Sequence, residues 1–420
     1  MGPGAVEGRQ KGAWACILTG PFGCRHCGDA VILWALPCGG VSALSSLCQL
    51  PTPSLLVDKP RMQANVRRLN ERLAGLGVPL RPHLKTCKNI EIARGMLSGH
   101  PGGATVSTLA EADYFFAHGI TDLLYAVGIA PGKLDGVAER MERGMDLSLI
   151  LDHPDAARAV AKAADRWGVR FRVLLEVDAD GHRAGFQPDD AGLVESAKIL
   201  DAAGCEAAGT MVHAGGSYAC RDTACIERVA EDERAAAVGA AEHLREAGFK
   251  APVVSVGSTP TLSFARDLTG VTEARAGVHV FQDLVMAGLG VCSVEDIALS
   301  VLTEVIGHKR PEGHLVVDAG WMALSRDRGT AGQTVDQGYG VVCDEAGHVM
   351  EGLIVQATNQ EHGIIAPREG GMLDPERFPI GTRLRVLPNH ACATGGQHGH
   401  FRMLDEHGQV SEKLERCSGW

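Results

Sequence analysis

The sequence predicts a (β/α)8 barrel of the TIM type followed by a smaller β-rich domain. Patterns typical of strands and helices alternate from residue 51 to about residue 295, and about eight such units favour a closed parallel barrel over an open doubly wound sheet. Beyond residue 295 the chain has short β segments and almost no helical periodicity. No Gly-x-Gly-x-x-Gly motif follows a predicted strand, so a dinucleotide-binding sheet has little support.

The barrel is predicted to span residues 51–295. A strand at 54–57 is followed by Asp58, a helix-capping residue, and by Pro60 in the first turn of a helix. The further predicted strands are 80–85, 104–108, 122–127, 146–151, 170–177, 206–213, 253–257 and 274–281. Alanine-rich amphipathic stretches predict helices at 154–167, 190–203 and 224–247.

The second domain is predicted to span residues 296–420. Its expected strands are 297–309, 314–318, 338–345, 348–357 and 381–387. Residues 344–348 have the composition of a turn, which predicts a hairpin between two of these strands.

Residues 1–50 fit neither domain. Glycine, cysteine and tryptophan are frequent there, and neither helical nor strand periodicity holds, so we expect a poorly ordered extension. The apolar run at 30–36 is too short to span a membrane. Five of the 13 cysteines lie in this segment. The eight cysteines of the body are expected to be reduced thiols, apart from the proposed metal ligand Cys392.

Composition narrows the class of protein. The chain has 420 residues, of which 45% are hydrophobic, and a net charge of −11. These values are ordinary for a globular enzyme, and the acidic balance argues against a protein that binds nucleic acid through a basic face. We therefore expect a cytoplasmic enzyme that binds neither nucleic acid nor a membrane.

Lys85 is the first candidate for chemistry. On a strand at 80–85, Arg81, His83 and Lys85 would point to one face, because side chains alternate along a strand. An amine that points inward from the carboxyl end of a barrel strand can act as a nucleophile and form a Schiff base.

Polar residues also follow other predicted strands, at the end of the barrel where active sites form. The small-residue turn 257–261 could bind a phosphate through backbone N–H groups and hydroxyls. A strand lysine, this turn and the segment 275–278 together make pyridoxal phosphate a plausible cofactor. The other polar residues at these ends are Thr108, Asp178, Asp180, His182, Arg183, His213 and Tyr218.

A second constellation lies near the end of the chain. His390 and Cys392 are two residues apart and would share a face at the end of a strand. Imidazole and thiolate together are ligands that zinc prefers.

Several of these motifs together resemble a known family. Residues 51 to about 405 are similar to the fold-type III pyridoxal-phosphate enzymes, which have an alanine-racemase-like barrel and a β domain, and in particular to the D-serine dehydratase and D-threonine aldolase group. The motifs that carry the resemblance are Thr52-Pro53-Ser54-Leu55, Arg81-Pro82-His83-Leu84-Lys85-Thr86, residues 178–185, His213-Ala214-Gly215, residues 257–261 and Pro388-Asn389-His390-Ala391-Cys392.

The resemblance implies a role for each matching residue. Lys85 would form the Schiff base with the cofactor and remove the α-proton, and His213 would be a second catalytic group. His390 and Cys392 would bind Zn²⁺, or another divalent ion such as Mn²⁺. The residues that would contact the cofactor are Arg183, Tyr218, Ser258, Thr259, Arg275, Gly277 and Val278.

The resemblance also suggests the reaction. The aldolase branch tends to have aspartate where this chain has Cys392, whereas the dehydratase branch has His-x-Cys. We therefore expect zinc-dependent elimination of water from a D-3-hydroxy amino acid, giving a 2-oxo acid and ammonia. The alternatives are a metal-dependent D-threonine or 3-hydroxyaspartate aldolase, a non-catalytic pyridoxal-phosphate carrier and a racemase. By analogy we expect a homodimer.

Overall fold

The structure, a computed structural model, describes residues 46–100 and 102–420. The prediction of an extension over residues 1–45 lies outside these residues, but residues 46–50 pack against the body. Leu50 is buried beside Leu56 and Leu302. Arg383 donates hydrogen bonds to the carbonyl oxygens of Cys48 and Leu50, at 2.9 and 2.7 Å. Residues 46–50 are therefore part of the folded body, contrary to the prediction of an extension up to residue 50.

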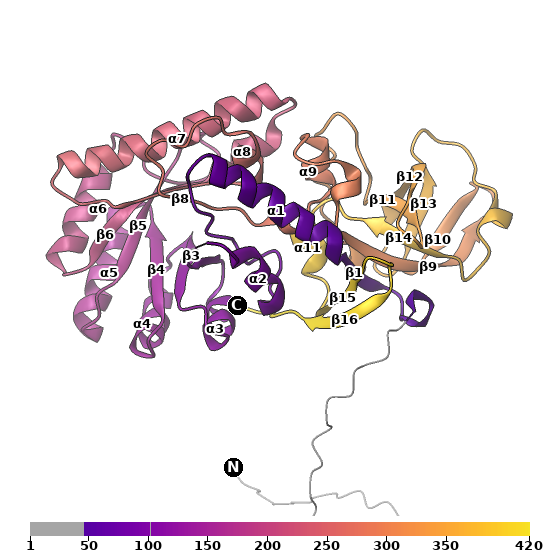
Figure 1. Ribbon diagram of the computed structural model, residues 1–420, viewed down its shortest axis with the longest axis horizontal. Helices are drawn as coiled ribbons and strands as arrows, with labels where there is room; N and C mark the ends of the chain where they lie inside the picture. The colour runs from indigo at the N-terminus through magenta and orange to yellow at the C-terminus, as the bar shows by residue number, and fades with distance from the viewer. Residues whose placement is uncertain (1–45, 101) are drawn as a thin grey trace, which may run out of the picture. The chain divides into compact units, whose positions relative to one another are not determined.

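A parallel sheet forms the barrel (Figure 1), with strand order β2-β3-β4-β5-β6-β7-β8. Residues 79–84 close it, because Leu80 bridges Ala274 of β8 and His83 bridges Thr105 of β2. The predicted (β/α)8 fold is therefore confirmed. The strands are β2 (Ala104–Val106), β3 (Asp122–Gly128), β4 (Asp146–Leu151), β5 (Arg172–Val177), β6 (Glu206–Val212), β7 (Val253–Val256) and β8 (Glu273–Ala274).

Two predicted strands, at 80–85 and 274–281, are almost absent as strands. The strand predicted at 80–85 is reduced to isolated bridges, because Pro79 and Pro82 have no N–H to donate to a ladder. The strand predicted at 274–281 ends at Ala274, and residues Val278–Val280 form a 3₁₀ turn.

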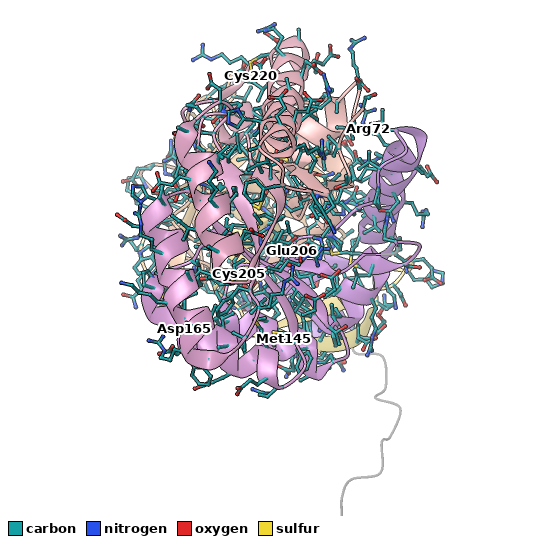
Figure 2. The ribbon with its side chains drawn as sticks, turned by 90° about the vertical axis from the view of Figure 1, so that its left-hand side faces the viewer. Arg72, Met145, Asp165, Cys205, Glu206 and Cys220 are labelled. Carbon is teal, nitrogen blue, oxygen red and sulfur yellow. A yellow bond between two sulfur atoms is a disulfide. The ribbon has the colours of Figure 1, made fainter. Side chains whose placement is uncertain are left out.

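Helices cover the outside of the barrel, which faces the viewer in Figure 2. The predicted helices at 154–167, 190–203 and 224–247 are observed as α5, α6 and α7 to within one residue at each end. On α5 the small residues of one face are buried, and Gly168 ends the helix with a φ of +66°. The barrel helices are α1 (Lys59–Gly75), α2 (Ile90–Leu97), α3 (Leu109–Ala117), α4 (Leu134–Glu142), α5 (Pro154–Trp167), α6 (Ala191–Ala202), α7 (Thr223–Glu246), α8 (Thr259–Phe264) and α9 (Leu284–Gly288).

The second domain is built on a nine-stranded sheet, in which β9 also pairs with β10 and so closes an antiparallel barrel. The strand predicted at 54–57 belongs to this sheet and not to the first barrel, because β1 pairs with β9 and β15. The elements are β1 (Ser54–Asp58), β9 (Leu299–Lys309), β10 (His314–Val317), α10 (Trp321–Leu324), β11 (Val341–Asp344), β12 (Val349–Thr358), β13 (Gly363–Pro367), β14 (Arg383–Leu387), α11 (Ala391–Gly395), β15 (His400–Leu404) and β16 (Val410–Glu415).

One cysteine prediction is wrong. Cys220 and Cys225 form a disulfide, with their Cα atoms 5.6 Å apart, whereas the body cysteines were expected to be reduced. The helical start at Thr223 turns the chain back and brings the two side chains together, which sequence spacing alone does not show.

No helix in the described part of the chain is both long and apolar enough to cross a membrane.

Candidate active site

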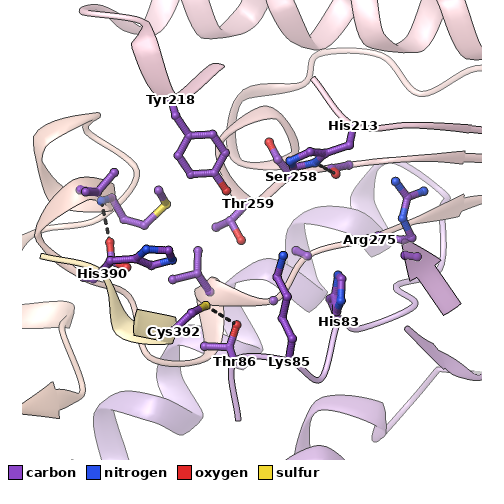
Figure 3. A pocket seen from close by; sticks show the side chains of 18 of the residues that line it. His83, Lys85, Thr86, His213, Tyr218, Ser258, Thr259, Arg275, His390 and Cys392 are labelled. Carbon is purple, nitrogen blue, oxygen red and sulfur yellow. Dashed lines mark hydrogen bonds between the residues drawn. The ribbon is translucent and has the colours of Figure 1, made fainter. Parts of the chain in front are cut away.

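A cavity of about 350 Å³ lies between the carboxyl ends of the barrel strands and the second domain. Every residue predicted for the site lines it, from both domains: Lys85, Arg183, His213, Tyr218, Ser258, Thr259, Arg275, Gly277, Val278, His390 and Cys392. Figure 3 labels eight of them, which converge from separate elements: Lys85, His213, Tyr218, Ser258, Thr259, Arg275, His390 and Cys392.

Lys85 enters the cavity from the turn that follows His83 (Figure 3). Burial and the positive charges of Lys85 and Arg275 lower the pKa of His83 well below its usual value. Arg81 points to the same inner side of the barrel but lies deeper, beside Leu124 and Leu174. It forms ion pairs with Asp122 and Glu273, at 2.8 and 2.7 Å, where β3 and β8 begin.

His213 follows β6 and is held as a neutral imidazole. Its Nδ1 donates to the carbonyl oxygen of Gly257 at 3.0 Å, so Nε2 is left as the proton acceptor. Burial is the main cause that lowers its pKa to about 4, and the charge of Lys85 adds to it. Glu233, which is buried on α7, accepts from the N–H groups of Ala214 and Gly257 and so fixes both loops.

The residues at the start of α8 fit a phosphate group. Ser258 caps the helix, since its hydroxyl accepts from the backbone N–H of Thr261. The hydroxyl of Thr259 is buried and has no hydrogen-bond partner among the described residues, which is costly unless a ligand occupies the site. Gly277 allows a close backbone approach nearby, because a Cβ there would lie 2.8 Å from the carbonyl oxygen of His83.

Two arginines, Arg275 and Arg183, are candidates to contact the cofactor ring, and they differ in exposure and in their contacts. Arg275 is 4% exposed and donates to the hydroxyl of Ser255 and the carbonyl of Val212, at 2.5 and 2.6 Å. The side chain of Arg183 is 55% exposed and pairs with Glu176 at 3.0 Å. Arg275 is therefore fixed by the barrel interior, and Arg183 can move toward a bound molecule.

The proposed metal ligands lie at a helix start and not at a strand end as predicted. His390 precedes α11 and Cys392 lies in its first turn. The Nδ1 of His390 donates to Oδ2 of Asp327 at 2.7 Å, an arrangement typical of metal-binding histidines. The hydroxyl of Thr86 lies 3.1 Å from Sγ of Cys392 (Figure 3).

The electrostatics of this pair suit a divalent cation. Burial opposes ionisation of Cys392, but the contact with His390 and the charge of Lys85 outweigh it and lower the pKa of the thiol. Burial likewise opposes the imidazolium, yet the hydrogen bonds to Asp327 and Cys392 raise the pKa of His390 to about 11. These shifts favour a thiolate at Cys392, and imidazole with thiolate is a ligand pair that zinc prefers. Within the described residues no group of three or more His, Cys, Asp and Glu side chains is placed to hold a metal.

Two residues that fix the candidate site, Asp327 and Asp283, have no signal in the local sequence. Asp327 lies in an irregular loop, and nothing in its local sequence connects it with His390. Asp283 caps α9 and also accepts from the N–H of Ala391 at 2.9 Å, so it holds the start of α11. Thr108, which was singled out as a strand-end residue, caps α3 instead.

Two family models match the chain in succession. The alanine racemase N-terminal domain matches residues 57–284, and the putative serine dehydratase domain matches residues 298–404. A D-threo-3-hydroxyaspartate dehydratase of Delftia sp. is 50% identical over 379 residues, which cover 89% of this chain and 99% of that protein. The chain belongs to this dehydratase family. It is accordingly a lyase built on the fold-type III, pyridoxal-phosphate-binding architecture.

Other relatives agree with this assignment. A D-serine dehydratase of Dictyostelium discoideum is 29% identical over 88% of this chain and 98% of that protein. The solved structure of the Delftia dehydratase has a TM-score of 0.88 and covers 89% of this chain and 100% of that one. An alanine racemase of Clostridium difficile is only 13% identical, yet its TM-score of 0.63 over 88% of this chain and 100% of that one shows the same fold.

Proposed function

We propose that the protein eliminates water from a D-3-hydroxy amino acid in a reaction that depends on pyridoxal phosphate and zinc, with D-threo-3-hydroxyaspartate as the first candidate substrate and D-serine as the second. The products would be a 2-oxo acid and ammonia. The observation that carries the proposal is the meeting of Lys85, from the barrel, and Cys392, from the second domain, in one cavity. The identity of 50% with the Delftia enzyme supports the choice of substrate.

The barrel residues would hold the cofactor at both ends. Lys85 would bind its aldehyde carbon, while the hydroxyl of Thr259 and the backbone at Gly277 and Val278 would bind its phosphate. When bound, pyridoxal phosphate delocalises the negative charge that develops at the substrate Cα.

The proton transfers fall to two residues of this chain. The Lys85 amine would remove the Cα proton of the substrate. His213 is neutral and has a free Nε2, because its Nδ1 donates to Gly257. His213 can therefore accept a hydrogen bond or a proton from the substrate.

The second domain would assist the departure of the hydroxyl group. His390 and Cys392 would hold zinc, which as a Lewis acid makes hydroxide a better leaving group. Asp327 orients the imidazole through the 2.7 Å hydrogen bond, and Thr86 donates to the thiolate. A related observation supports this site. In solved histidine-to-alanine and cysteine-to-alanine variants of a D-threo-3-hydroxyaspartate dehydratase, the latter in a metal-free form, the two replaced residues are two positions apart, as His390 and Cys392 are.

The alternatives differ in their products or their requirements. An aldolase would break the Cα–Cβ bond, and relatives with that activity include a D-threonine aldolase 28% identical to this chain over 84% of its length. A pyridoxal-phosphate carrier would need neither His390 nor Cys392. A racemase would need a second base opposite Lys85.

A product assay separates these possibilities. The purified protein, supplied with pyridoxal phosphate and Zn²⁺, is incubated with D-threo-3-hydroxyaspartate, D-serine or D-threonine, and ammonia, 2-oxo acid, glycine and aldehyde are measured. We expect ammonia and 2-oxo acid in equal amounts, fastest from D-threo-3-hydroxyaspartate. Glycine with an aldehyde would instead identify an aldolase.

We also propose that two copies of the chain associate, which sedimentation equilibrium tests.

A further inference from the structure

Arg416 lies at the junction of the two domains, just after the last strand. The yellow C-terminal segment in Figure 1 leaves β16 and returns to the barrel. The backbone N–H of Cys417 donates to the carbonyl oxygen of Lys88 at 2.8 Å, which fixes this return. Arg416 is 7% exposed, and its guanidinium lies 5.1 Å from the centre of the Phe401 ring.

The guanidinium of Arg416 binds backbone carbonyls of both domains. On the second-domain side it donates to the carbonyls of Gly395, the last residue of α11, and of His398, the latter at 3.1 Å. On the barrel side it donates to the carbonyl of Thr86 at 3.3 Å. A buried guanidinium is costly unless its donors are used. Here the two Nη atoms join two separate chain segments, while Nε has no hydrogen-bond partner among the described residues.

Both segments carry reactive residues of the proposed site. Thr86 follows Lys85 directly, and its hydroxyl lies 3.1 Å from Sγ of Cys392. Cys392 lies in the first turn of α11, whose last carbonyl binds Arg416. A shift of either segment would therefore change the distance between the Lys85 amine and the Cys392 thiolate.

We propose that Arg416 is a positioning residue, which sets the placement of Cys392 relative to Lys85 by holding the end of α11 and the Thr86 carbonyl together. The proposal rests on the proposed function for the identity of the reactive groups. It extends the site to a residue that touches neither cofactor nor substrate, and it explains why a charged side chain is buried at the domain junction.

The test compares four variants in the full-length protein. Arg416→Met removes the hydrogen bonds and keeps much of the side-chain volume, while Arg416→Lys keeps the charge but not the planar fork of donors. Gly395→Ala leaves Arg416 in place and crowds it, because the added Cβ would lie 3.3 Å from the nearer guanidinium nitrogen. Arg383→Met is the matched control, since Arg383 also joins distant segments through two carbonyls, those of Cys48 and Leu50, but lies outside the cavity.

Three quantities are measured for each variant: the absorbance of bound pyridoxal phosphate, the Kd for Zn²⁺ by competition with a chromophoric chelator, and kcat and KM for the substrate that the product assay identifies. For Arg416→Met we expect unchanged cofactor absorbance and KM, with Zn²⁺ affinity and kcat reduced about 10- to 100-fold, as for other groups that orient metal ligands. Arg416→Lys should recover part of this loss. Arg383→Met should leave Zn²⁺ affinity and kcat unchanged even where it lowers the midpoint of thermal unfolding.

Two results would overturn the proposal. One is wild-type Zn²⁺ affinity and kcat in Arg416→Met. If that variant does not fold, Gly395→Ala decides: a smaller loss of both quantities supports the positioning role, and wild-type values contradict it. In a folded Arg416→Met background Gly395→Ala should cause no further loss, because its effect acts through Arg416. Release of ammonia by wild-type protein without Zn²⁺ would contradict the proposed zinc-dependent function. In that case the positioning role of Arg416 would be judged from kcat alone: a reduced kcat in Arg416→Met would support it, and a wild-type kcat would contradict it.

Discussion

Replacement of Asp327 by asparagine tests how the imidazole of His390 is held. The carboxylate of Asp327 accepts two hydrogen bonds, from the backbone N–H of Gly329 at 2.7 Å and from Nδ1 of His390 at 2.7 Å. An amide has only one oxygen acceptor. Asp327→Asn must therefore either lose one of these bonds or turn its NH₂ group toward another donor.

The size of the effect follows from the bond that is lost. A hydrogen bond to a charged group contributes about 1.5–3 kcal/mol, and the 30% exposure of the Asp327 side chain places this one toward the lower end. Since about 1.4 kcal/mol corresponds to tenfold in affinity, we expect Asp327→Asn to bind Zn²⁺ about tenfold more weakly. At limiting Zn²⁺ its turnover should fall in parallel.

A matched control is available in the hairpin between β11 and β12. Asp344 also accepts from a backbone N–H and from an imidazole, those of His348, at 2.9 and 3.1 Å. Asp344→Asn should leave Zn²⁺ affinity unchanged. Competition with a chelator gives the Kd of each protein, and wild-type affinity in Asp327→Asn would refute the assigned orientation of His390.

Two further substitutions test buried groups. Thr259→Val removes a buried hydroxyl that lacks a partner among the described residues, so we expect the cofactor-free protein to gain about 1 kcal/mol of stability and the Kd for pyridoxal phosphate to rise about tenfold. Denaturant unfolding and absorbance titration measure these changes, and an unchanged cofactor Kd would remove Thr259 from the phosphate site. His279 is 1% exposed, and burial, with a smaller contribution from His100, lowers its pKa to about 3. Below about pH 6.5 the unfolded chain therefore binds more protons at His279 than the folded chain does. The contribution of the neutral imidazole to the free energy of unfolding should be fully present above that pH and fall toward pH 3. His279→Phe should accordingly lose about 2–3 kcal/mol less stability than the wild type between about pH 6.5 and 4.5. Equal slopes of stability against pH for the two proteins would contradict this.

The sequence predicts the barrel helices well because their determinants are local. The helix at 154–167 has a proline in its first turn, a buried stripe of small residues and Gly168 at its end, and all of these lie within the helix or next to it. The strand-like segments at 80–85 and 274–281 are different, because their length depends on neighbours in the barrel. Pro79, Pro82 and the close approach at Gly277 shorten them.

The site residues were predictable where a motif carries them. Lys85, the turn 257–261 and the His-x-Cys pair are each visible in the sequence, and the fold brings them to one cavity. Asp327 and Arg416 were not predictable, because each acts on residues distant in the sequence, through a side chain on an irregular segment or just after a strand. β1 was assigned to the wrong domain for a similar reason, since strand pairing partners lie far along the chain.

The most direct test of the proposed reaction is removal and return of the metal in wild-type protein and in Cys392→Ala. Both proteins are treated with EDTA, saturated with pyridoxal phosphate and assayed for ammonia from D-threo-3-hydroxyaspartate before and after Zn²⁺ is added. We predict that EDTA abolishes ammonia release, that Zn²⁺ restores it only in the wild-type protein, and that Cys392→Ala keeps the absorbance of bound cofactor. Full activity in the EDTA-treated wild-type enzyme would contradict a zinc-assisted elimination at His390 and Cys392.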